Sequence, residues 1–106
     1  MMKTIKFTNN SNIKITITLK EKSQVKADKQ DISPSSFALF EFKNEEYQIE
    51  YCNIFMSIDK FLISQTVSPI SALSHLDRMF NSHHEFKIFF DQFSYQVLLV
   101  PIDEED

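Results

Sequence analysis

The sequence predicts an α+β fold, with a mainly antiparallel sheet of about five or six strands and one main helix packed on it. Two observations lead to this prediction. Apolar and polar residues alternate strictly in several short stretches, which is typical of strands with one buried face. Residues 69–80 instead repeat their apolar members at helical spacing. A length of 106 residues fits a single domain, residues 1–106, with one modest core.

Residues 3–20 are expected to form a β-hairpin. Isoleucine or leucine alternates strictly with lysine and threonine in the stretch NIKITITLK, and the stretch TIKFT alternates in the same way. The asparagine-rich residues 9–12 between them suit a turn. Ile15 and Ile17 are therefore predicted to be core residues, and Thr16 is predicted to face solvent.

The next segment, residues 21–36, is polar and ends in a proline and serine cluster. A long loop is expected there, with a short edge strand around residues 25–27 as an option. The stretch FALFEFK that follows alternates again, so it predicts a strand with Ala38, Phe40 and Phe42 on one face.

A further strand is expected in the stretch EYQIEY, after a tight turn at Asn44–Glu45. It places Tyr47, Ile49 and Tyr51 on one face. The apolar residues then change phase, which a strand cannot do without a bulge or a break. Cys52–Asn53 is the expected place of this irregularity.

The main helix is expected at residues 69–80. Ser68 suits its N-cap and Pro69 its first position, and Asn81 suits a left-handed residue at its end. The apolar stripe that would face the sheet consists of Ile70, Leu73, Leu76 and Phe80.

Two segments fit more than one structure. Residues 59–66 fit a strand end or a helical turn. Residues 82–93 contain a capping-box pattern and a helical spacing of phenylalanines, but their phenylalanine and β-branched content is typical of strands. Of the two, we expect a hairpin that turns around Asp91–Ser94.

The chain contains no glycine, although about 7% is usual. Glycine allows a backbone to take positive φ or to approach a phosphate closely. Its absence excludes a Walker loop, a dinucleotide-binding fingerprint and a G-x-S-x-G nucleophile elbow. Asparagine tolerates left-handed conformations next best, so it is predicted to replace glycine at the chain reversals, at Asn9, Asn10, Asn12, Asn44 and Asn81.

Charge is unevenly distributed along a chain whose net charge is −4. Residues 1–30 hold seven lysines against two acidic residues, and residues 31–106 hold four basic residues against thirteen acidic ones. The first residues contain no apolar stretch of a secretory signal, and no apolar run approaches a membrane span. Cys52 is the single cysteine and is expected to fill space in the core. With no disulfide possible, no signal and no membrane span, a soluble cytoplasmic protein is predicted.

No catalytic, cofactor or metal site is predicted. His83 and His84 are adjacent, so their side chains diverge, and His75 has no histidine four residues away. They are expected to be polar residues beside a helix end. No local signature marks a nucleophile or an acid–base pair, so we expect no enzyme. No aromatic residues lie between the lysines of the basic N-terminal part to stack on bases, and the chain as a whole is acidic. Direct nucleic-acid binding is therefore not expected either.

Aromatic residues are abundant, with eleven phenylalanines and three tyrosines. Phe37 and Leu39 lie opposite the inward face of their strand, and Phe89 lies opposite Ile88 and Phe90. These strands are therefore apolar on both faces. Either both faces are covered, or an apolar patch is exposed for a partner.

The expected function is that of a small acidic protein-binding module, an inhibitor that neutralises a basic partner such as a toxin or nuclease. In size, charge and lack of motifs the chain looks like a bacterial immunity protein or antitoxin, and no motif ties it to a family. The residues expected to bind the partner are Glu45, Glu46, Glu50, Asp103 and Glu104. The alternatives are a self-associating or chaperone-like structural protein without catalysis and, third, an enzyme without a local signature.

Overall fold

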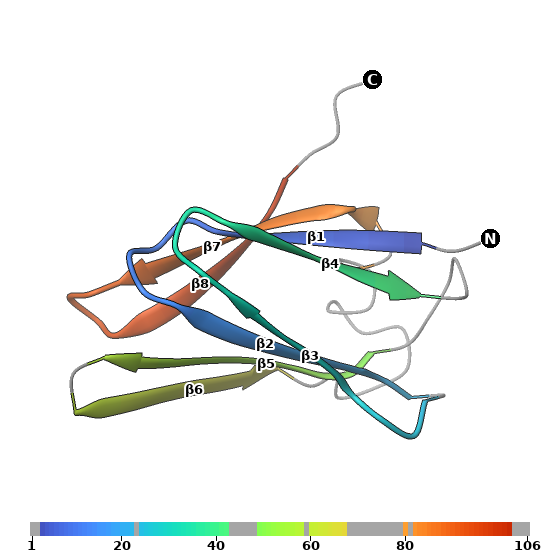
Figure 1. Ribbon diagram of the computed structural model, residues 1–106, viewed down its shortest axis with the longest axis horizontal. Helices are drawn as coiled ribbons and strands as arrows, with labels where there is room; N and C mark the ends of the chain where they lie inside the picture. Colours follow the sequence, from blue (N-terminus) through green and yellow to red (C-terminus); the bar gives the residue numbers. More distant parts are fainter. Residues whose placement is uncertain are drawn as a thin grey trace.

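In the described part of the chain, eight strands form two four-stranded sheets that lie face to face (Figure 1). The structure is a computed structural model that describes residues 3–22, 24–42, 49–58, 60–67, 80 and 82–102. The strands are β1 (Lys3–Asn9), β2 (Ile15–Glu21), β3 (Asp28–Ile32), β4 (Phe37–Phe42), β5 (Ile49–Ile58), β6 (Phe61–Val67), β7 (Glu85–Asp91) and β8 (Gln96–Pro101). Sheet A has the order β4-β1-β7-β8, and sheet B has the order β3-β2-β5-β6. Neighbouring strands are antiparallel, except that β1 and β7 run parallel.

The prediction of an α+β fold with one main helix is wrong. All elements in the described part of the chain are strands. A sheet with one apolar face must bury it against another layer, and here the second layer is the other sheet instead of a helix. Most of the expected helix, residues 69–79, lies outside the described residues. Its last apolar member, Phe80, is fully buried in the core.

Alternating side chains from both sheets make one hydrophobic core. In β2 every second residue is buried, and in β4 the buried residues are Ala38, Phe40 and Phe42, as predicted. Ile15 and Ile17 are fully buried, which confirms their assignment to the core. Period-two alternation therefore identified correctly which face of β2 and β4 points inward, whereas in β5 its prediction that Tyr51 shares the face of Ile49 is wrong.

The predicted hairpin of residues 3–20 is wrong in its pairing, although both of its strands exist. β1 pairs with β4 and β7 in sheet A, whereas β2 pairs with β3 and β5 in sheet B. The link between them crosses from one layer to the other. The buried side chain of Asn9 holds this crossing, because its amide donates to the carbonyl oxygens of Ile13 (2.8 Å) and Ile32 (3.0 Å) and its oxygen accepts from Ser11.

The observed strands also test several smaller predictions. The polar segment of residues 21–36 contains an edge strand, β3, which begins slightly later than the short strand considered around residues 25–27. Residues 61–67 are a strand. The hairpin of β7 and β8 is confirmed, with its turn at Gln92–Tyr95. The tight turn expected at Asn44–Glu45 lies outside the described residues, and β4 and β5, on either side of it, belong to different sheets.

The irregularity predicted in β5 is confirmed, close to its expected position. Lys20 of β2 pairs with Tyr51, but the next residue, Glu21, pairs with Ile49, so Glu50 is the extra residue of a β-bulge. The bulge lies just before Cys52–Asn53. Its effect is that Ile49 and Cys52, three residues apart, both face the core.

Two residues in the described part of the chain have positive φ without being glycine, Ser35 (63°) and Tyr95 (56°). The prediction that asparagine takes this role is wrong for Asn9, Asn10 and Asn12. Ser35 belongs to the β3–β4 link, where its amide donates to the Asn9 carbonyl. Asparagine serves that region through side-chain hydrogen bonds instead of through its own backbone conformation.

The two faces of β2 give a direct stability test. Ile17→Ala is expected to lower the free energy of unfolding by about 2–4 kcal/mol, because it leaves a cavity in the core. Thr16→Ala is expected to cost under about 1 kcal/mol, since its hydroxyl donates to Asp31 on the solvated face. Urea unfolding followed by circular dichroism measures both. Equal losses would mean that β2 is buried on both faces.

Candidate protein interface

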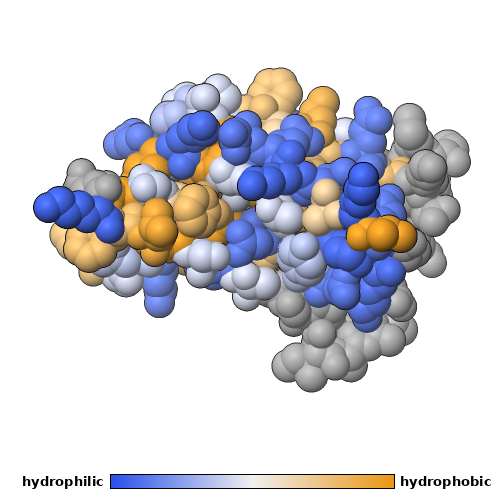
Figure 2. Space-filling model, turned by 60° about the horizontal axis from the view of Figure 1, so that its bottom comes forward, coloured by the Kyte–Doolittle hydropathy of each residue, from blue (hydrophilic) through white to orange (hydrophobic). Residues whose placement is uncertain are grey.

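Exposed apolar side chains gather on one side of the sandwich. Among the described residues, ten large apolar side chains are exposed, and seven of them belong to β6, β7, β8 and the β7–β8 turn. We call these seven the β6–β8 side; they are Phe61, Leu62, Phe89, Phe93, Tyr95, Leu98 and Val100. In Figure 2, orange side chains cluster at the left-hand end, the end at which Figure 1 places the β5–β6 and β7–β8 turns. Exposed apolar clusters are typical of interaction surfaces, so this side is the candidate interface.

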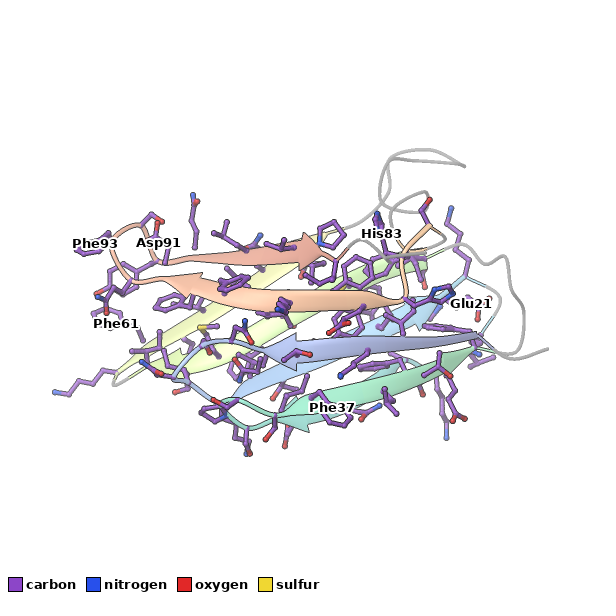
Figure 3. The ribbon with its side chains drawn as sticks, turned by 90° about the horizontal axis from the view of Figure 1, so that it is seen from above. Glu21, Phe37, Phe61, His83, Asp91 and Phe93 are labelled. Carbon is purple, nitrogen blue, oxygen red and sulfur yellow. The ribbon has the colours of Figure 1, made fainter. Side chains whose placement is uncertain are left out.

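The most exposed members form an aromatic end, which consists of Phe61, Leu62, Phe93 and Tyr95. Their exposed fractions are 62%, 72%, 90% and 55%. Figure 3 places Phe61 and Phe93 at the same end of the molecule, beside Asp91. The Tyr95 ring lies 6.2 Å from the ring of Phe61 and 6.2 Å from that of Phe90, measured between centroids. These ring contacts join the β6 start to the β7–β8 hairpin.

The turn that carries this end is tightly held. The Asp91 carboxylate accepts hydrogen bonds from the Phe93 amide (3.0 Å) and the Ser94 hydroxyl (2.9 Å), and these bonds lower the pKa of that carboxyl. Tyr95 takes a left-handed backbone conformation, which is costly for a bulky residue. Such strain persists where the surrounding contacts outweigh it, and it concentrates at functional sites.

A cleft of about 690 Å³ opens beside the aromatic end, between the β1–β2 link and the β7–β8 turn. Ile13, Ile58 and Phe90 give it an apolar part. Its polar rim comes from the β1–β2 link and from the start of the turn, and consists of Asn10, Ser11, Asn12, Asp91 and Gln92. A cleft of this size, next to exposed aromatics, can receive an apolar side chain of a partner.

The two edge strands on this side carry no charge, since β6 reads FLISQTV and β8 reads QVLLVP. The opposite edges are charged: β3 contains Asp28, Lys29 and Asp31, and β4 contains Glu41. Charged side chains deter edge strands from pairing with other chains. The β6–β8 side lacks this protection in its side chains.

Glutamines instead protect single backbone groups at both edges. The Gln65 side chain of β6 accepts a hydrogen bond from the Val97 amide of β8 (3.3 Å), and the Gln30 side chain of β3 donates to the Leu39 carbonyl of β4 (2.6 Å). Each contact ties an edge of one sheet to the other. Pro101 also lacks an amide to donate at the end of β8.

The strands expected to be apolar on both faces are exposed on their outer faces. Phe37 is 56% exposed, and Leu39, Phe89 and Leu98 are also exposed. Of the two alternatives, the exposed apolar patch is therefore the one observed for these side chains. Phe37 and Leu39 lie apart from the others, on the far edge strand β4, and the Lys6 ammonium lies 4.5 Å from the ring centroid of Phe37.

The residues expected to bind a partner lie mostly outside the described residues, namely Glu45, Glu46, Asp103 and Glu104. Glu50 is described: it is exposed on the outer face of sheet B and forms an ion pair with Lys20. Sequence reasoning missed the aromatic end. The available signal was the stretch DQFSY, in which two aromatic residues occupy a turn, where polar residues are usual.

The polar candidates show no arrangement for catalysis or metal binding. No group of three histidine, cysteine, aspartate or glutamate side chains converges within the part of the chain that the structure describes. His83 packs edge-on against the Phe86 ring at 6.1 Å. His75 lies outside the described residues. No helix among the described residues is long and apolar enough to cross a membrane.

Cys52 is buried in the core, and burial raises the pKa of its thiol to about 12. The thiol is then protonated at neutral pH, whereas the thiolate is the reactive form. We expect the folded protein to react with a disulfide reagent such as Ellman's reagent only at the rate of unfolding. Rapid reaction in native buffer, compared with the protein in urea, would contradict this assignment.

No family model, no curated protein and no solved structure matches the chain. The assignment of the candidate interface therefore rests on the geometry described above.

Proposed function

We propose that this chain is a protein-binding module without catalysis, and that the β6–β8 side is its contact surface. The observation that carries the proposal is the aromatic end, where Phe61, Leu62, Phe93 and Tyr95 are all more than half exposed. Exposed side chains of this size are costly in water unless a partner covers them. Aromatic residues are also the type most often found at the energetic centre of interfaces.

The end is well suited to bind because it is already ordered. The hydrogen bond from the Phe93 amide to Asp91, and the contacts of the Tyr95 ring with Phe61 and Phe90, fix the turn before a partner binds. A rigid aromatic contact loses little conformational entropy on binding, so more of the burial energy appears as affinity.

The net charge of −4 supports a basic partner, as for an inhibitor or immunity protein that neutralises a toxin or nuclease in the cytoplasm. Charges would act around the contact and not at its centre, because β6 and β8 carry none. Glu45, Glu46, Glu50, Asp103 and Glu104 are then proposed as rim charges. Rim charges chiefly set the association rate and its salt dependence.

Self-association is the second candidate function. The observation in its favour is the lack of charge on β6 and β8 in a chain that is acidic overall. Two copies that meet through this side do not bring like charges together. A mass that rises with concentration, measured by light scattering after gel filtration, would support this candidate.

Site-specific photo-crosslinking tests the proposal. A benzophenone amino acid is placed at Phe93 in one variant and at Phe37 in the matched control, since both are exposed phenylalanines on opposite edges. We expect one discrete product from position 93 and none from position 37. A product of twice the chain mass would identify the partner as a second copy. Equal labelling at both positions would contradict the β6–β8 side as the contact surface.

A further inference from the structure

The β-bulge in β5 turns an aromatic side chain outward. Ile49 and Cys52 both face the core, so the two residues between them, Glu50 and Tyr51, both lie on the outer side of sheet B. Without the bulge, Tyr51 would share the inward face with Ile49, as the alternation alone predicted. Bulges are known for redirecting a side chain at binding sites.

Tyr51 lines a shallow, open depression of about 450 Å³ on this outer face, together with Thr18, Asn53 and Thr66. The last three come from adjacent strands and are direct cross-strand neighbours, because Thr18 pairs with Asn53 and Asn53 pairs with Thr66. A row of two hydroxyl groups and one amide therefore crosses β2, β5 and β6 beside the phenol ring. Figure 2, with the sheet B side brought forward, shows mostly pale and blue side chains over the middle of this side.

Asn53 is held in one orientation. Its amide nitrogen donates to the Ser64 hydroxyl (2.9 Å) and to the Thr66 hydroxyl (2.7 Å). Its amide oxygen accepts no hydrogen bond from the residues that the structure describes. That oxygen is therefore a preorganised acceptor on a residue that lines the depression.

Every group that lines the depression is neutral. Two lysines near it are paired, since Lys20 forms an ion pair with Glu50 and Lys14 lies 3.6 Å from Asp31. Lys29, the cross-strand neighbour of Thr18, forms no ion pair with the residues that the structure describes. A single lysine at the border is less than a nucleic acid backbone requires, because several cations hold such a chain, and a purely apolar ligand would leave the hydroxyl and amide groups unpaired. The lining instead matches a ligand that is uncharged and rich in hydroxyl groups.

We propose that this depression binds a neutral carbohydrate chain. The aliphatic C–H face of a sugar ring would pack on the Tyr51 ring, whose face carries partial negative charge. Sugar hydroxyls would exchange hydrogen bonds with Thr18, Thr66 and the Asn53 oxygen, since each hydroxyl both donates and accepts. An open depression, unlike an enclosed cavity, allows the chain to continue on both sides. This site is on the outer face of sheet B and is separate from the aromatic end.

Nuclear magnetic resonance titration of the labelled protein tests this site. The probes are maltohexaose, cellohexaose and chitohexaose, each added separately. We expect at least one of them to shift the amide signals of Thr18, Tyr51, Asn53 and Thr66, with a dissociation constant of roughly 0.1–1 mM, as suits one ring contact and a few hydrogen bonds.

Tyr51→Ala should raise that dissociation constant at least tenfold, whereas Tyr51→Phe should retain most of the binding. Thr66→Val, which removes a hydroxyl with little change in shape, should weaken binding several-fold if Tyr51→Ala does not fold. Phe37→Ala, which removes an exposed aromatic ring from β4 in sheet A, serves as the control and should change nothing. The proposal is overturned if no probe shifts these signals, or if the shifts persist in both Tyr51→Ala and Thr66→Val.

Discussion

Replacing Phe7 with alanine is expected to lower the free energy of unfolding by about 3–5 kcal/mol. Phe7 is fully buried in β1, at the centre of an aromatic cluster. Its ring lies 5.3 Å from the ring of Phe40, 5.6 Å from that of Phe86 and 6.1 Å from that of Phe80. The substitution removes these contacts and leaves a cavity between β4 and β7, in the middle of sheet A. A loss of this size is a large part of the stability of a small domain, typically about 5–15 kcal/mol.

Urea unfolding of Phe7→Ala beside Phe93→Ala gives the comparison. Both variants lose one phenylalanine, but Phe93 is 90% exposed, so its replacement should change stability by less than about 0.5 kcal/mol. A loss below about 1 kcal/mol for Phe7→Ala would show that sheet A is not packed around this cluster.

Replacing Asn9 with alanine is expected to cost about 3 kcal/mol, because several buried polar groups lose their partners at once. The carbonyl oxygens of Ile13 and Ile32 lose a donor, and the amide and hydroxyl of Ser11 lose an acceptor. These groups lie where the chain crosses from sheet A to sheet B, so no strand ladder replaces the lost bonds. Asn10→Ala is the control on the same link, since its side chain is exposed and should contribute little.

Asn9→Asp separates the donor role from the acceptor role of this side chain. A carboxylate keeps the bonds to Ser11 but turns its second oxygen against the Ile13 and Ile32 carbonyls. Its pKa in the folded state is then raised above the unfolded value, so the variant should be least stable at neutral pH and recover part of its stability as the pH is lowered through that pKa. Thermal unfolding at several pH values checks this, and a loss that does not depend on pH would contradict the assigned orientation of the amide.

Most strands and inward faces were predictable from the sequence, but among the pairings only the β7–β8 hairpin was. Alternation in β2 identifies Ile15 and Ile17 as core residues whichever strand lies beside them, because period two specifies a face and not a neighbour. The hairpin predicted for residues 3–20 does not form, because the side-chain hydrogen bonds of Asn9 hold the chain where it crosses from sheet A to sheet B. Those bonds join residues up to 23 positions apart, and no local pattern reveals them.

The expected helix led to the wrong fold class. The helix was inferred from the helical spacing of apolar residues in residues 69–80, and with a helix as the second layer all strands were expected in one sheet. The polar stretch DKQDI was taken as part of a loop because only Ile32 in it is buried, as suits an edge strand with little contact to the core. Once that stretch counts as a strand, there are enough strands for two sheets that cover each other.

The candidate interface was only partly predictable. Strands that are apolar on both faces indicated exposed patches, and Phe89 is indeed exposed. The aromatic residues in the turn DQFSY were the one sequence signal for the aromatic end, and the place of Phe61 beside Tyr95 was not predictable, because it depends on how the two sheets pack. The outward position of Tyr51 was not predicted, because the alternation placed Tyr51 with Ile49 and the irregularity was expected after it, at Cys52–Asn53. Its polar neighbours come from β2 and β6, whose pairing with β5 the sequence does not specify.

The central claim is that the β6–β8 side contacts a partner. The most direct test is the affinity of the crosslinked partner for two matched variants. Kinetic binding is measured for Phe93→Ala and Phe37→Ala at low and high salt. The proposal predicts that Phe93→Ala raises the dissociation constant about 30-fold, equal to about 2 kcal/mol for a central aromatic, mainly through faster dissociation. Phe37→Ala should change it less than twofold. Equal effects of both variants, or no effect of Phe93→Ala, would contradict a partner contact through the β6–β8 side.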